Sequence, residues 1–122
     1  MIIVGLLVAG GVGSVLRYLV DRTVQSRVGS DVPLGILVVN LSGALALGFL
    51  VGVGLHHGIS ATWLTVLGTG LIGAYTTFST FAFDSVRLAE ADQWGMAAAN
   101  MAVSVALGIG AAAAGLALAS LT

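Results

Sequence analysis

The charged residues of this 122-residue chain fall in two short stretches and leave long uncharged tracts around them. Sixteen uncharged residues precede Arg17, 52 separate Asp31 from Asp84, and 30 follow Asp92. A helix needs about 20 predominantly apolar residues to cross the hydrocarbon core of a bilayer. The first and last tracts therefore each suit one crossing, and the middle tract suits two. This spacing predicts an all-α integral membrane protein with four transmembrane helices.

We expect one membrane domain over residues 1–122, with helices at about 2–20, 33–55, 62–88 and 95–121. Only 7% of the residues are charged, whereas about a quarter are charged in a soluble domain. Pro33 suits the first turn of a helix. Trp63 and Trp94 stand at the starts of spans, where indole rings favour the headgroup level. The first tract lacks a basic leader, so we expect it to be a retained span and not a signal peptide.

The arginines predict how the chain is oriented in the membrane. Arg22 and Arg27 lie between the first two spans and Arg87 lies at the end of the third, so with four spans they share one side. The turn HHGIS at 56–60 and both chain ends share the other side and carry no arginine. Because basic residues favour the cytoplasm, we expect the arginine-bearing loops inside and both termini outside.

Small residues recur along the expected helices. Gly5, Ala9 and Gly13 repeat every four residues, and Gly48 and Gly52 form a GxxxG pair. Such residues let membrane helices approach closely. Packing within one subunit would explain them, and so would a subunit interface. Four short helices with no soluble domain can hardly enclose a pathway alone, which favours an oligomer.

Two signals typical of soluble or metal-binding proteins lack their context. GTGLIG at 68–73 matches the GxGxxG pattern, but no strand precedes it and it lies within a span. His56 and His57 are adjacent, with no nearby acid or thiol, and indicate a solvated turn. Neither signal predicts a nucleotide or metal site.

Polar side chains inside the spans are more informative, because they need hydrogen-bond partners in hydrocarbon and tend to face the protein interior or a pathway. They are Arg17 in the first span, Asn40 and Ser42 in the second, Thr76, Thr77, Ser79 and Thr80 in the third, and Asn100 and Ser104 in the fourth. Each has an ordinary explanation: a cation can snorkel to the headgroups, an amide can bond a neighbouring helix, and hydroxyls can bond their own helix. Together they supply donors and positive potential without an opposing carboxylate, which suits an anion.

The third span combines these hydroxyls with aromatic rings. On a continuous helix, Phe78 and Phe81 lie about 60° apart on one face, and Thr76 and Thr80 lie on another with Gly73. Ring edges carry partial positive charge and can attract a small anion. The glycine-rich lead followed by hydroxyls also favours a helix break, whose carbonyls could hold a cation, as broken helices do in transporters.

These residues resemble the Fluc (CrcB) family of fluoride channels over nearly the whole chain. The matching motifs are GGVGSVLRY at 10–18, the asparagine of VVNLSGALALGF at 38–49, and GTGLIGAYTTFSTF at 68–81. The resemblance implies an antiparallel, dual-topology dimer of four-helix subunits, with two fluoride pores across the dimer and a break in the third helix. It implies passive export of fluoride across the plasma membrane, which protects the cytoplasm from fluoride toxicity.

The resemblance also implies roles for individual residues. The expected fluoride path comprises Phe78, Phe81, Asn40, Ser79, Thr80, Ser104 and, at its vestibule, Arg17. Backbone carbonyls of Gly73 and Thr76 would hold a structural sodium ion at the dimer centre. Asn100 stands where relatives often carry tyrosine, so the outer polar track can differ here.

Three alternatives remain at this point. A small multidrug-type exporter would need a carboxylate deep in the first span, and the first 16 residues have none. A non-transporting assembly subunit would explain the glycines but not the phenylalanine pair. An enzyme is disfavoured because no buried acid, base or nucleophile set is visible. The one-sided arginines also leave two assemblies open, a homodimer or a heterodimer with an oppositely oriented homologue.

Overall fold

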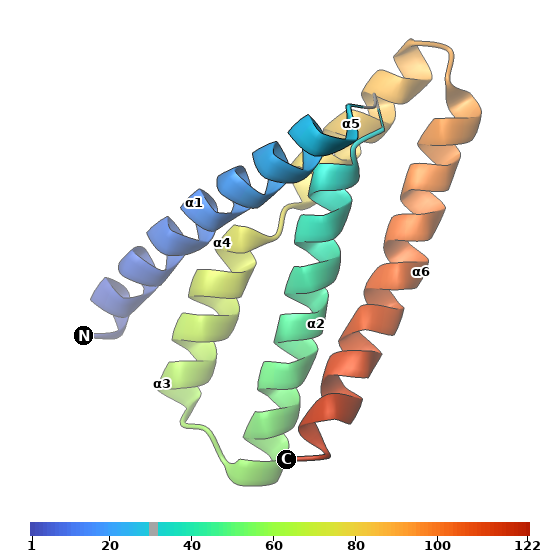
Figure 1. Ribbon diagram of the computed structural model, residues 1–122. Coiled ribbons are helices and arrows are strands. Elements are labelled where there is room, and N and C mark those ends of the chain that lie inside the picture. The colour runs from blue at the N-terminus through green and yellow to red at the C-terminus, as the bar shows by residue number, and fades with distance from the viewer. Residues whose placement is uncertain (30–31) are drawn as a thin grey trace.

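The computed structural model describes residues 1–29 and 32–122, and every regular element within them is a helix (Figure 1). Four helical segments are long and apolar enough to cross a membrane: Ile2–Val28, Leu34–His57, Ala61–Glu90 and Trp94–Ala119. This confirms the all-α fold with four membrane-spanning helices. The expected loop residues Ser30 and Asp31 lie outside the described part of the chain.

Helix α1 spans Ile2–Val28 and continues through the first charged stretch, beyond the expected helix end at about residue 20. It ends at Gly29, which has φ 60° and donates its N–H to the Gln25 carbonyl at 3.1 Å. This left-handed conformation favours glycine because a side chain would be strained there. The Gln25 side chain accepts from the Gly35 N–H at 3.1 Å and so joins the end of α1 to the start of the next helix.

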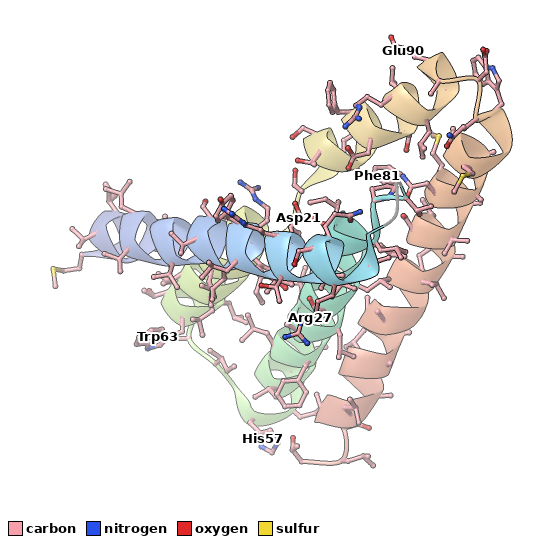
Figure 2. All side chains as sticks on the ribbon, turned by 45° about the horizontal axis from the view of Figure 1, so that its top comes forward. Asp21, Arg27, His57, Trp63, Phe81 and Glu90 are labelled. Atoms are coloured by element: carbon pink, nitrogen blue, oxygen red, sulfur yellow. The ribbon has the colours of Figure 1, made fainter. Side chains whose placement is uncertain are left out.

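Helix α2 spans Leu34–His57, and Pro33 lies immediately before it instead of inside its first turn. Helix α6 spans Trp94–Ala119. The two helices meet at one end of the molecule, where His57 Nε2 lies 3.2 Å from Thr122 Oγ1, and Figure 2 shows His57 beside the chain's C-terminal end. The opposite end carries the connection from α1 to α2 and the loop that precedes α6 (Figure 1). Arg22 and Arg27 lie near the end of α1 and Arg87 lies in the last turn of α5, so these arginines share one end of the fold (Figure 1).

The third span consists of several pieces. They are α3 (Ala61–Leu64), the π-helix η1 (Thr65–Ile72), α4 (Gly73–Tyr75) and α5 (Phe78–Glu90). Between α4 and α5, Thr76 and Thr77 are extended, with φ/ψ of −79°/158° and −148°/124°. The expected break in the third span is confirmed. It falls after the glycine-rich stretch, which is itself wound as the wider π-helix.

Small residues bring the helices together. A Cβ atom at Gly48 of α2 would lie 2.9 Å from the carbonyl carbon of Ala112 in α6, and one at Gly115 would lie 2.7 Å from the Phe49 nitrogen. We call this glycine-packed contact the α2–α6 seam. Helix α1 crosses the third span in a similar way, because a Cβ atom at Gly13 would lie 3.0 Å from the Tyr75 nitrogen. Close backbone approach thus supplies the dispersion contacts that hold membrane helices together.

Candidate functional site

A groove of about 390 Å³ lies where α2, the broken third span and α6 come together. Six of the nine predicted site residues line it: Asn40, Gly73, Thr76, Phe78, Phe81 and Ser104. In Figure 2, Phe81 lies between the ribbons of α2 and α6. The structure therefore brings the amide, both rings, the fourth-span hydroxyl and both carbonyl residues to one surface.

Asn40 holds the two residues of the break. Its Nδ2 donates to the Thr77 carbonyl at 3.0 Å, and its Oδ1 accepts from the Thr77 N–H at 2.9 Å. The donor and acceptor of Thr77 fix the orientation of the amide, because the flipped amide would face like groups. Buried backbone groups outside a helix need such partners. Asn40 thus satisfies, from α2, the backbone that the break exposes.

The hydroxyls that follow form a cap for α5. Thr77, only 8% exposed, accepts from the Thr80 N–H at 3.3 Å. Its Oγ1 also lies 3.1 Å from Thr80 Oγ1 and 3.3 Å from Ser79 Oγ. A threonine at the position before a helix commonly satisfies one of the first unpaired N–H groups in this way. Ser79 and Thr80 are therefore tied to the start of α5, and neither lines the groove.

These side-chain bonds change the environment of the two predicted carbonyls. In a continuous helix, the Gly73 carbonyl would accept from the Thr77 N–H and the Thr76 carbonyl from the Thr80 N–H. Here, Thr77 donates to Asn40 and Thr80 donates to the Thr77 side chain. Both N–H groups that would engage those carbonyls in a helix have other acceptors. Carbonyl oxygens that are not held by these N–H groups suit a bound cation.

The two rings lie side by side but differ in exposure. Their centroids are 5.7 Å apart and their planes are tilted by 53°. Phe81 is 9% exposed, whereas Phe78 is 78% exposed. The sequence pattern placed both on one face of α5, and both do line the groove. The same pattern placed Thr76 and Thr80 together on a second face, which is wrong because the extended Thr76–Thr77 segment interrupts the helical rotation.

Thr80 lines a second cavity, of about 490 Å³, near the arginine-bearing end. Asp21 of α1 and Asp84 and Arg87 of α5 line it as well. Arg17 lies one turn before Asp21 on α1, is half-buried, and lines neither cavity in the single subunit. Its role at a vestibule stays a prediction.

Sequence reasoning missed two elements of the site. Tyr75 ends α4, and its hydroxyl lies 2.8 Å from Ser42 Oγ, which links the break to α2 a second time. Ser85 is 5% exposed, accepts from Asn100 Nδ2 at 2.9 Å and donates to the Phe81 carbonyl at 2.9 Å. The sequence showed these polar groups within spans, but pairing them requires the arrangement of the helices.

This arrangement defines a class of multi-pass membrane protein whose polar site is built around a broken helix. Residues 4–116 match the family described as CrcB-like protein, Camphor Resistance (CrcB). The chain belongs to this family.

Relatives of the chain carry a more specific description. "Fluoride-specific ion channel FluC 2" of Mycolicibacterium paratuberculosis is 51% identical over 118 residues, which cover 97% of this chain and 93% of the relative. The protein of that name from Mycobacterium tuberculosis strain H37Rv is 48% identical over 109 residues, covering 89% of this chain and 83% of the relative. "Fluoride-specific ion channel FluC 1" of Streptomyces avermitilis is 46% identical over 112 residues, with 90% of each chain covered.

Proposed function

We propose that this chain is the subunit of a fluoride-selective ion channel. The observation that carries the proposal is the groove, where an amide, two phenylalanine rings and a serine hydroxyl from three helices meet. The names of the relatives support it, since they are described as fluoride-specific ion channels. The function is conduction, not catalysis.

The chemistry of the groove suits fluoride. Fluoride is small and strongly hydrated, so a pathway must replace its water with donors that hold it weakly and in series. Ring edges at Phe78 and Phe81 and the hydroxyl of Ser104 are such donors. Asn40 has a second amide hydrogen besides the one given to Thr77. A conduction path through these groups would be passive and would release fluoride down its gradient.

A second subunit would complete the path. Phe78 is 78% exposed in the single subunit, and a ring that acts in a pore must be enclosed. We propose an antiparallel, dual-topology dimer in the bilayer, with two pores. The partner is either a second copy of this chain or an oppositely oriented homologue. The one-sided arginines favour a fixed orientation with the arginine-bearing loops in the cytoplasm.

We also propose a structural sodium ion at the dimer centre, held by the backbone carbonyls of Gly73 and Thr76 from each subunit. Sodium is a hard cation that prefers oxygen ligands, and unwound helix carbonyls coordinate it in transporters. When bound, it would supply positive charge at the membrane midplane, where a cationic side chain is costly. The diversion of the Thr77 and Thr80 N–H groups to other acceptors supports this assignment.

The physiological role that follows is passive fluoride export across the plasma membrane, which protects cytoplasmic enzymes. The competing proposals are weaker. A multidrug-type exporter lacks its carboxylate in the first 16 residues. A non-transporting assembly subunit would not need polar groups gathered in a groove.

Fluoride efflux from liposomes that contain this chain alone tests the proposal, with a fluoride electrode as readout and chloride as the control anion. Rapid fluoride release without chloride release would support a selective channel and show that a homodimer suffices. No fluoride release from well-folded protein would point to a missing partner subunit. If fluoride release is still absent after co-expression with an oppositely oriented homologue, the channel proposal is refuted.

The orientation is tested separately with a C-terminal reporter read from both sides of the membrane. One dominant population with an external C-terminus would support fixed orientation and a heterodimer. Equal populations of the two orientations would refute fixed orientation and leave the homodimer.

A further inference from the structure

We infer that Asn40 is a positioning residue that maintains the break in the third span, acting through the backbone of Thr77. Its side chain replaces the helical partners of Thr77 and so keeps the Gly73 carbonyl out of a helical hydrogen bond. The link to a cation rests on the proposed sodium site. The contact between Asn40 and Thr77 does not.

The geometry of Asn40 supports this role. Both polar atoms of its amide bond one residue, Thr77, at 3.0 and 2.9 Å. Thr77 is 37 residues away in sequence, lines the same groove, and is itself only 8% exposed. A buried N–H left without a partner costs about 1–3 kcal/mol. Without Asn40, the Thr77 N–H and the Thr77 carbonyl would both lose their partners, and the extended conformation of the break would no longer be fixed.

This role differs from that of a simple fluoride donor. The Asn40 oxygen and one of its two amide hydrogens are engaged within the subunit. At most one amide hydrogen is left for an anion. Substitution of Asn40 would therefore alter the backbone of the break as well as the lining of the groove, and the two effects can be measured separately.

Residue-resolved amide hydrogen exchange on the full-length protein in nanodiscs tests the inference. In Asn40→Ala, we expect the Thr77 amide to exchange about tenfold faster, because its acceptor is lost. In Asn40→Asp, the acceptor oxygen for the Thr77 N–H remains while the donor to the Thr77 carbonyl is lost, and we expect Thr77 exchange to be accelerated less than in Asn40→Ala. Asn100→Ala is the matched control, since it removes an amide that bonds Ser85 of α5 and not Thr77.

Unchanged Thr77 exchange in Asn40→Ala would overturn the inference. If that variant does not fold, Asn40→Asp decides, and Thr77 exchange accelerated there by about tenfold or more would overturn it as well. A second measurement concerns sodium alone: the thermal stability of the protein in sodium chloride is compared with that in choline chloride. We expect sodium to stabilise the original chain and to stabilise Asn40→Ala less.

These readouts keep the proposals apart. No sodium effect on the original chain would refute the proposed cation site, while the Thr77 exchange would still decide the role of Asn40. Neither measurement uses fluoride efflux. A failure of the channel proposal would therefore be detected separately, in the efflux assay.

Discussion

The two halves of α6 contact the rest of the subunit by different means. In the C-terminal half, Ala112 and Gly115 meet α2 so closely that a methyl group at Gly115 would lie 2.7 Å from the Phe49 nitrogen. In the N-terminal half, Asn100 bonds Ser85 of α5, and Ser104 faces the groove. The C-terminal half is held by the close approach of small residues, and the N-terminal half carries polar side chains that face α5 and the groove.

The difference shows how a small membrane protein can be rigid and still provide a polar surface. Glycine contacts hold helices through dispersion and leave no room for a ligand. Farther along the same pair, the groove forms where α2, the third span and α6 come together. The seam therefore fixes α2 and α6 relative to each other, and the groove lies between the parts of these helices that carry polar side chains.

The seam is where we expect the largest effect. Gly48→Ala or Gly115→Ala places a methyl group against backbone atoms that cannot rotate away. Overpacking of this kind costs about 1–3 kcal/mol in the free energy of unfolding, and occasionally more. Steric-trapping measurements of unfolding, together with size-exclusion profiles, would show it. Original stability in both variants would contradict the close approach of α2 and α6.

On the groove side, we expect a loss of transport without a loss of fold. Phe78→Ile removes a ring that is 78% exposed in the subunit, so its packing within the subunit is slight. Fluoride efflux should fall at least tenfold, equivalent to about 1.4 kcal/mol in the barrier, while the melting temperature changes little. Phe83→Ile is the matched control, because Phe83 is 62% exposed on the same helix and does not line the groove. Equal efflux from both variants would remove Phe78 from the path.

The polar contact in the N-terminal half of α6 should have a moderate effect. Ser85→Ala leaves the Asn100 amide without its acceptor and costs about 1–2 kcal/mol of unfolding free energy. A double-mutant cycle with Asn100→Ala measures the coupling between the two side chains. Additive effects would mean that the contact does not hold α6 to α5.

The smallest effect is expected at Gly110, on the face of α6 where an added Cβ atom meets nothing within 4 Å. In a single subunit, Gly110→Ala should change the free energy of unfolding by no more than about 0.5 kcal/mol. The same stability assay applies, read at low and high protein-to-lipid ratios. A loss that appears only at the high ratio would place a second subunit against this face.

The sequence alone was sufficient for the number of spans, because crossing a bilayer depends on local composition. It also located the break within the third span, since glycines and hydroxyls gather there. The sequence alone did not predict which residues form the break. Thr76 and Thr80 were expected on one helical face, and the extended Thr76–Thr77 segment separates them. The contact of Asn40 with Thr77 spans 37 residues and depends on how α2 lies against the third span. No local pattern contains that information.

The seam also has a consequence for how the chain is made. It joins the second helix to the last one, so the glycine face of α2 cannot meet its partner until α6 has been synthesised. At that point, the first three spans have already been synthesised. A chain that stops short of α6 would therefore leave the glycine face of α2 without the partner it packs against.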